Sequence, residues 1–467
     1  MGVAVSGWRL ASAVSRLGQL GVVSGTALAL VLARSLQDGD PGGHRRRALA
    51  AFPDEALAGR VLDRYFLAAG RNAGRGHRAA PVPRRFPSRS FLELTVAASF
   101  VEVFLAKEGH DGEVGINLLE KIQLPTLPAL YGAMLAGVDG VLMGAGIPSN
   151  IPGALDALAA QERVELPLAV VGARPADAYA VAFDPGSIVR APTQPLTRPR
   201  FFAIVGSHVL AAHLARHEES CPDGFVVERP IAGGHNAPPR GRLQLSETGE
   251  PLYGPRDDVD LERMRELALP FWLAGGYGHP EKLREALAAG AAGIQVGSAF
   301  ALTEESGLDH ELKALARERA SAGTLEVRTD PVASPTGYPF KVATLPGTVA
   351  DPAVYAARRR RCDLGYLATL YRRDDGSVGY RCPGEPREDY VMKGGEGEDT
   401  TGRTCLCNGL MASAGLPQRR PGEGLEPPIV TLGDDTSAIL AELSPDGAPY
   451  TASAVIRYLL GAVTAPA

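Results

Sequence analysis

The chain has 467 residues, of which 45% are hydrophobic and 22% are charged, a composition typical of a soluble globular protein with a sizeable core. Its formal net charge of −5 argues against a nucleic-acid or anionic-membrane partner, because such binders carry a basic patch or stripe. Five cysteines, an odd number in a long chain, do not form the framework of a secreted disulfide-rich protein. We therefore expect a cytoplasmic protein. The sequence contains 42 Arg and only 6 Lys, which favours a bacterial, GC-rich origin.

The first apolar stretch, Leu17–Ala33, is uncharged and is the one membrane-like segment of the sequence. Polar residues and glycines interrupt it, and no small-residue cleavage site follows a clean apolar core. It is interpreted as a buried strand that runs into a helix. No targeting segment is expected.

Short apolar runs alternate with helical patterns over residues 1–305, as in βαβ units with a parallel sheet. Seven runs are visible: Gln19–Ser24, Val114–Leu118, Val138–Gly144, Phe201–Gly206, Gly224–Arg229, Pro270–Gly275 and Gly293–Gly297. An eighth is expected around Met1–Val5, where the chain looks cut short. The fold class predicted is α/β, a (β/α)₈ TIM barrel whose first strand is truncated. Such a truncation would leave two unpaired sheet edges.

Local signals place three further elements within the barrel. Ser90 with Glu93 three residues later predicts a capping box at the start of a helix that ends at Gly109. A second helix is expected over Glu281–Ala289, between the last two strands. A small hairpin is expected between Leu168–Val171 and Tyr179–Phe183.

The alternating pattern stops near residue 305, and residues 306–467 are predicted to be a loop-rich extension packed on the barrel. One clear helix is expected there, over Asp309–Ala322. Ser334–Lys341 has turn chemistry, and it is interpreted either as a lid over the barrel mouth or as a surface turn. Four cysteines follow a C-x₁₉-C-x₂₂-C-x-C spacing: Cys362, Cys382, Cys405 and Cys407. Free thiols and no metal are expected, with a structural zinc site as the alternative.

The strongest chemical signal is a pair of glycine-bearing strand ends, Leu273–Gly278 (LAGGYG) and Gln295–Phe300 (QVGSAF). In a (β/α)₈ barrel, the loops after the last two strands and a short helix form the standard phosphate site. Glycines let backbone N–H groups approach phosphate oxygens closely, and a Ser hydroxyl adds a donor. These roles fit Gly275, Gly276, Gly297 and Ser298. The alternative is that the glycines only permit tight turns.

A second signal is the segment Gly224–Gly241, where Gly233 and Gly234 deliver His235 to the same end of the sheet. The unperturbed pKa of histidine lies near neutrality, which suits the abstraction of a weakly acidic carbon proton. His235 is therefore predicted to be a catalytic base. The alternative is a surface histidine or a satisfied core histidine.

Taken in this order and spacing, AGGHN (Ala232–Asn236), LAGGYG and GIQVGSAF resemble the FMN-binding nitronate monooxygenases, formerly called 2-nitropropane dioxygenases. The resemblance implies an FMN cofactor and a histidine base at His235. It implies that Gly275, Gly276, Gly297 and Ser298 hold the FMN phosphate. Further cofactor contacts implied are Asn117 at the flavin ring, Gln295, Gly233 and Gly234, and Glu228, which stands where the family often has glutamine. Met1–Gly2 stands where the family has a Gly- or Pro-Met element.

The resemblance implies FMN-dependent oxidation of alkyl nitronates, or of nitroalkanes after deprotonation by His235, with O₂. The alternative is an NAD(P)H-dependent flavin enoyl reductase of fatty-acid or polyketide synthesis acting on an enoyl thioester. A third hypothesis is a zinc- or cofactor-binding scaffold without turnover. The expected partners are a small-molecule substrate and either O₂ or NAD(P)H, with no nucleic acid, no membrane and a possible homo-oligomer.

Overall fold

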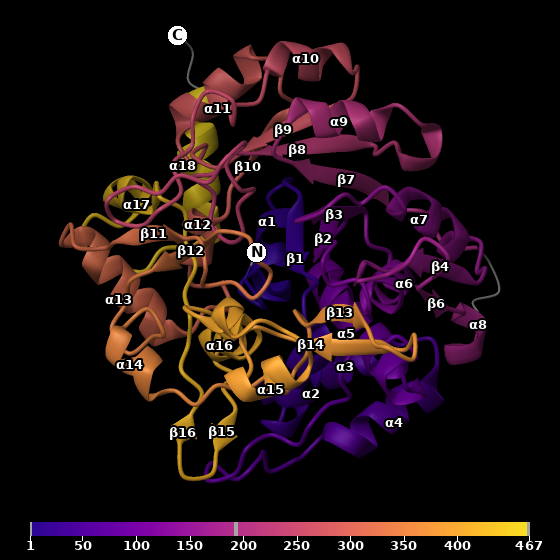
Figure 1. Cartoon of the computed structure of the whole chain (residues 1–467). Coiled ribbons are helices and arrows are strands. Elements are labelled where there is room, and N and C mark those ends of the chain that lie inside the picture. The colour runs from indigo at the N-terminus through magenta and orange to yellow at the C-terminus, as the bar shows by residue number, and fades with distance from the viewer. Residues whose placement is uncertain (1, 191–194, 465–467) are drawn as a thin grey trace.

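A curled sheet of seven parallel strands forms the framework of the protein (Figure 1). The computed structural model describes residues 2–190 and 195–464. The strands follow one another in the order β1 (Gly21–Ser24), β2 (Val114–Leu119), β3 (Gly140–Gly144), β7 (Arg200–Val205), β8 (Gly224–Glu228), β9 (Phe271–Ala274) and β10 (Gly293–Gln295). Each of the seven predicted runs overlaps one of these strands, so the α/β class and the parallel sheet are confirmed.

The predicted eighth strand is wrong for the residues that the structure describes. From Gly2 to Ser6 the chain forms turns, with Ala4 in the left-handed region at φ 53°. Ser6 nevertheless lies beside β1, because its carbonyl accepts a hydrogen bond from Ser24 N at 2.8 Å. Within the described ranges no strand joins β1 to β10, so the sheet is a curled, open one. Closure into a (β/α)₈ barrel remains a prediction.

Helices cover the outer face of the sheet, as the crossover rule for parallel strands requires. The helices of residues 1–305 are α1 (Trp8–Ser15), α2 (Leu28–Gln37), α3 (His44–Ala50), α4 (Glu55–Tyr65), α5 (Arg89–Lys107), α6 (Thr126–Leu135), α7 (Ile151–Ala159), α8 (Pro185–Ile188), α9 (His208–Ala215), α10 (Leu261–Glu266), α11 (Pro280–Ala288) and α12 (Ser298–Ala301), the last of which lies at the carboxyl end of the strands. The stretch Leu17–Ala33 contains β1 and the start of α2, as predicted. No helix in the described parts of the chain combines the length and the apolar character needed to span a bilayer.

Side chains alternate between the two faces of the sheet, which decides what its inner face presents. Leu142, Phe202, Val226 and Ala274 form a small inner cluster that is separate from the large core under the helices. Residues two positions further along a strand share the face of these residues. At the carboxyl end of the strands, the inner face is therefore lined by the inward-facing side chains that come after this cluster.

Two local predictions were shifted by a few residues. The cap of α5 is Ser88, which accepts from Phe91 N at 3.2 Å, whereas Glu93 pairs with arginines and not with the helix start. The predicted hairpin exists as β4 (Val164–Pro167) against β6 (Ala180–Phe183). The predicted first strand, Leu168–Val171, comes after β4 in the chain. Its last two residues form β5 (Val170–Val171), which pairs with the extension and not with β6.

The extension contains more regular structure than predicted. Its elements are α13 (His310–Ser321), β11 (Val327–Asp330), β12 (Phe340–Ala343), α14 (Pro352–Ala357), β13 (Thr369–Arg372), β14 (Val378–Arg381), α15 (Arg387–Met392), α16 (Leu406–Ser413), β15 (Arg419–Arg420), β16 (Gly424–Leu425), α17 (Thr436–Leu443) and α18 (Ala452–Thr464). The helix expected over 309–322 is α13. Strand β13 adds to β5, and α18 packs on α1 and α11. The division into residues 1–305 and 306–467 remains a prediction.

The four cysteines of the extension lie close together, although three separate segments carry them. The thiols of Cys362 and Cys382 interact, as do those of Cys405 and Cys407, and this proximity and burial raise the pKa of Cys407. All five cysteines of the chain are free thiols. In the described residues no three His, Cys, Asp or Glu side chains are arranged to hold a metal ion. The zinc alternative remains a hypothesis.

Close packing of α5 on α6 gives a prediction about stability. A Cβ on Gly132 of α6 would lie 2.1 Å from the carbonyl oxygen of Val96 on α5, which is backbone and cannot swing away. Gly132→Ala should therefore lower the free energy of unfolding by about 1–3 kcal/mol, measured by denaturant titration. The control is Gly59→Ala on α4, where a Cβ meets nothing within 4 Å. An equal effect of both changes would contradict this account of the packing.

Candidate active site

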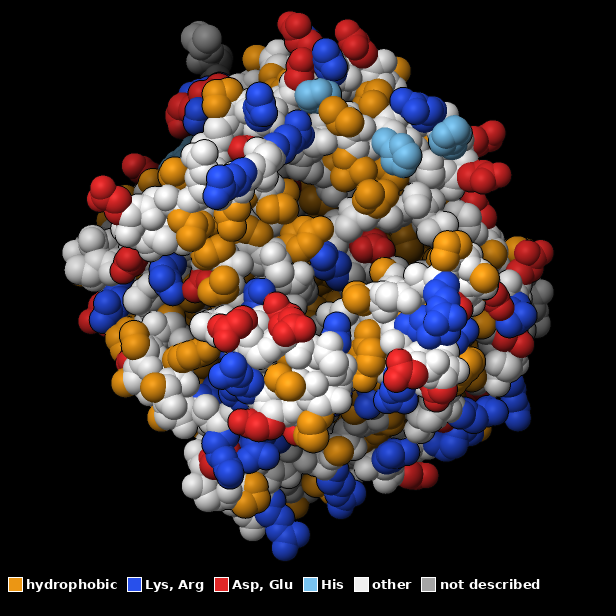
Figure 2. All heavy atoms as spheres, viewed as in Figure 1, with side chains coloured by type: hydrophobic (Ala, Val, Ile, Leu, Met, Phe, Trp, Pro, Cys, Tyr) orange, Lys and Arg blue, Asp and Glu red, His pale blue; other side chains and the backbone are white. Residues whose placement is uncertain are grey.

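Three predicted cofactor contacts share the inner face at the carboxyl end of the sheet. Asn117 on β2 pairs in register with Leu142 of the inner cluster. Glu228 on β8 and Gln295 on β10 both pair with Ala274, another member of that cluster. Because paired residues of neighbouring strands point to the same face, the three side chains face into the curl. Figure 2 shows this side of the molecule hollowed at its centre, with an acidic and a basic side chain inside.

The predicted phosphate site has the free donors that a phosphate needs. Gly275 and Gly276 have φ values of 82° and 80°, the left-handed region that favours glycine. No described residue accepts a hydrogen bond from the backbone N–H of Gly275, Gly276, Gly297 or Ser298. A Cβ on Gly297 would meet nothing within 4 Å, so space is open at this point. Helix α12 begins directly after Gly297, as the barrel rule predicts.

His235 lies at the same end of the sheet, on the loop after β8. Its Nε2 is 2.7 Å from Ser334 Oγ, and its ring packs edge-on against Phe340 at 4.9 Å between centroids. Backbone hydrogen bonds hold the loop on both sides of the histidine, from Lys341 N to Gly234 O and from Asn236 N to Pro339 O. The ring is thus oriented by the extension. When Nε2–H donates to Ser334, the free lone pair is on Nδ1.

Ser334–Lys341 lies at the mouth of the sheet, which supports the lid interpretation over the surface turn. Ser334 is fully buried against His235. The ring of Tyr338 has Lys121 Nζ at 3.5 Å from its centroid, a cation–π contact with the residue that follows β2 by two positions. The segment therefore connects the β2 side of the mouth to the β8 side.

Burial shifts the proton affinities of the two central titratable groups in opposite directions. It raises the pKa of Glu228 to about 7 and lowers the pKa of His235 to about 3, to which the Lys121 charge adds only a smaller shift in the same direction. At neutral pH His235 is therefore uncharged and can accept a proton. Glu228 is about half ionised at that pH, which makes it a second group able to exchange protons.

The glycines before His235 have a role that the sequence did not predict. Gly234 N donates to Thr431 Oγ1 at 2.7 Å, so this N–H is not free for a cofactor. A Cβ on Gly233 would lie 2.9 Å from the backbone carbon of Leu432. Gly233 and Gly234 thus permit the close approach of a C-terminal segment, and direct cofactor contact through them remains a prediction.

That segment, Thr431–Asp435, connects the loop after β8 to the predicted phosphate site and was missed by sequence reasoning. Gly433 N donates to Ser298 Oγ at 2.7 Å, and Asp434 N donates to Ile231 O at 3.1 Å. Asp434 is also paired with the buried Lys341 at 2.5 Å. Burial raises the pKa of Asp435, at the end of this segment. Its sequence signal, an apolar run followed by Gly-Asp-Asp, was visible but not distinctive.

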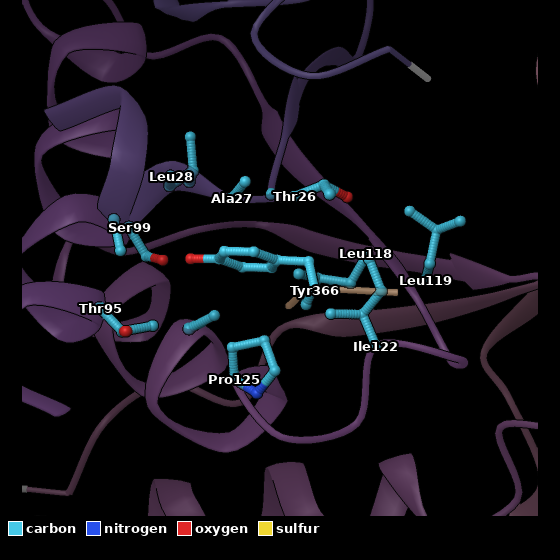
Figure 3. Close-up of a pocket in the computed structure, with 13 residues that line it drawn as sticks. Thr26, Ala27, Leu28, Thr95, Ser99, Leu118, Leu119, Ile122, Pro125 and Tyr366 are labelled. Atoms are coloured by element: carbon cyan, nitrogen blue, oxygen red, sulfur yellow. The ribbon is translucent and has the colours of Figure 1, made fainter. Parts of the chain in front are cut away.

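One enclosed pocket near the sheet is too small to be the site. It lies between α2, α5 and the loop after β2, and Tyr366 of the extension closes it (Figure 3). Its volume of about 10 Å³ holds no more than a water molecule. Figure 3 shows the Tyr366 hydroxyl pointing toward Ser99, whose Oγ has no hydrogen-bond partner in the described structure.

Comparison with known proteins supports the sequence resemblance. A family model described as nitronate monooxygenase matches residues 170–332, which include His235 and the predicted phosphate residues. The resemblance to this family of oxidoreductases is thereby confirmed over that segment. Asn117 lies outside it. No curated protein matches the chain.

Three solved structures are similar to the chain at low identity. FabK from Thermotoga maritima is 15% identical with a TM-score of 0.48, over 98% of this chain and 89% of that one. A nitroalkane oxidase from Streptomyces ansochromogenes is 14% identical with a TM-score of 0.47, over 99% and 93%. The enoyl reductase domain of MlnA from Bacillus amyloliquefaciens is 16% identical with a TM-score of 0.32, over 58% and 59%.

Proposed function

We propose that the protein is an FMN-dependent oxidoreductase that oxidises alkyl nitronates, or nitroalkanes that it first deprotonates, with O₂. The observation that carries this proposal is the juxtaposition of an uncharged, oriented histidine with a glycine-lined set of free backbone N–H groups at one end of a parallel sheet. FMN, bound there, would supply the redox chemistry.

The residues present fit the cofactor at both of its ends. The free N–H groups of Gly275, Gly276, Gly297 and Ser298 suit a terminal phosphate, and the open space at Gly297 leaves room for it. At the other end, the side-chain amide of Asn117 is buried and faces into the curl. Asn236 Oδ1 is buried without a donor among the described residues.

The protein's own groups account for the proton transfer. A neutral nitroalkane loses a carbon proton to His235, and the imidazolium that forms is stabilised by the anion that forms beside it. Lys121, held against Tyr338, adds a positive charge at the mouth that favours an anionic nitronate. The lid segment, Ser334–Lys341, and the C-terminal segment Thr431–Asp435 exclude water from the reacting groups.

The enoyl reductase remains the second candidate, since Lys121 and Tyr338 could also hold a polar thioester. The two functions separate in one pair of assays on the purified chain. We expect O₂ uptake with an alkyl nitronate and no need for a nicotinamide. Anaerobic bleaching of the flavin by NADH or NADPH, followed by reduction of an enoyl thioester and no nitronate turnover, would contradict the proposal and favour the reductase.

A further inference from the structure

A cavity of about 190 Å³ lies in the extension, between the end of α14 and the segment that leads into α16. Its lining consists of Tyr355, Ala356, Arg358, Arg360, Arg403 and Thr404. Three of these six side chains are guanidinium groups and none is a carboxylate. The volume is several times the roughly 30 Å³ that one water occupies in the liquid, so a phosphoryl group fits inside.

Two of the three arginines are not neutralised. Arg358 is paired with the buried Glu426, to which its Nε donates at 2.7 Å. Arg360 and Arg403 form no ion pair with any residue that the structure describes. Their hydrogen bonds go to backbone carbonyls, which carry no net charge. The cavity therefore faces two positive charges that attract an anion.

Those carbonyls also fix the two side chains in place. Arg403 donates through Nε to Asp399 O at 3.1 Å and through Nη1 to Val332 O at 2.8 Å and Ser334 O at 2.6 Å. Arg360 donates through Nη2 to the carbonyls of Thr400 and Arg403. A guanidinium has five donors, and Arg403 Nη2 and Arg360 Nε and Nη1 have no described acceptor. Side chains fixed in advance lose little entropy when they bind a ligand.

We infer that this cavity binds the phosphoryl group of a small-molecule ligand. The remaining donors, Arg360 Nε and Nη1 and Arg403 Nη2, carry two positive charges without ion pairs, and a phosphoryl group offers several anionic oxygens to accept from them. The cavity also adjoins the candidate active site, because Arg403 holds the carbonyl of Ser334 while the Ser334 hydroxyl contacts His235. The inference goes beyond the proposed function, because an alkyl nitronate and O₂ carry no phosphoryl group.

Isothermal titration of the full chain with pyrophosphate tests the binding. We expect Arg360→Gln to weaken it about 10- to 100-fold, the effect of losing a charge-assisted hydrogen bond. The control is Arg359→Gln, because Arg359 is the sequence neighbour, is 74% exposed and is paired with Glu423 outside the cavity. If Arg360→Gln lowers the Tm, Arg360→Lys replaces it, since it keeps the charge and removes the Nε and Nη1 donors. The inference would be overturned if pyrophosphate did not bind, or if the Arg359 and Arg360 variants lost the same amount of pyrophosphate affinity.

Two ligand pairs identify the carrier. Tighter binding of NADPH than of NADH, with the difference lost in Arg360→Gln, identifies a phosphorylated dinucleotide. Tighter binding of coenzyme A than of its 3′-dephospho form, lost in the same variant, identifies a thioester carrier. If neither pair differs while pyrophosphate still binds at Arg360, the inferred phosphoryl site stands and its ligand is neither NADPH nor coenzyme A. A protein without flavin would defeat the proposed function but leave pyrophosphate binding unchanged.

Discussion

His235→Ala should slow turnover of a neutral nitroalkane by roughly 10²–10⁴-fold while FMN stays bound, the usual contribution of a positioned base. The structure gives the reason, since His235 is uncharged at neutral pH and is held by Ser334 and Phe340 at the mouth of the sheet. Oxidation of a preformed nitronate should suffer much less, because its carbon proton is already gone. Steady-state kinetics on the two substrates measure both effects.

The pH dependence of turnover separates His235 from Glu228 as the base, because the two groups have different pKa values. If His235 is the base, its pKa of about 3 means that it is already deprotonated above about pH 5, so its ionisation leaves nitroalkane turnover flat from there to alkaline pH. If Glu228 is the base, turnover rises as pH increases through about 7, and Glu228→Gln abolishes that rise. Equal losses on nitroalkane and nitronate in His235→Ala, with a rise that depends on Glu228, would assign the proton transfer to Glu228.

Gly297→Asp should weaken FMN binding by about 10- to 1,000-fold, because it places a carboxylate in the open space beside the free N–H groups of the phosphate site. Folding should be unaffected, since a Cβ there meets nothing within 4 Å and Asp is a favoured residue at the start of a helix. Titration of the apoprotein with FMN, followed by flavin fluorescence, measures the change.

The matched control adds the same charge away from the mouth of the sheet. Gly59→Asp on α4 also meets open space and should bind FMN as the unmodified chain does. If Gly297→Asp binds FMN equally well, the phosphate lies elsewhere and the glycines at 275, 276 and 297 serve only as turn residues.

The strands and their ends were predictable because their signals are local. Each strand is a short apolar run, and glycine marks the strand ends at Gly275 and Gly297. The inner-face position of Asn117 follows once the register is known, but the register itself needs the neighbouring strand. The error at the helix start arose because Ser88 and Ser90 are both suitable caps, and only the structure shows which one accepts from Phe91.

The parts that the sequence could not predict depend on contacts between distant segments. Thr431 contacts Gly234 across 197 positions, and Ser334 contacts His235 across 99. No local pattern records such pairings, because they depend on how the extension returns over the sheet. Helix α18 was also missed, and its place on α1 and α11 follows only from the folded chain.

Release of the cofactor from the purified full chain is the measurement that tests the central claim. Denaturation should release a yellow compound that chromatography and mass identify as FMN, at about one per chain, because the strand ends provide a site for one terminal phosphate. Release of FAD, or a protein that stays colourless and binds no added FMN, would contradict the account.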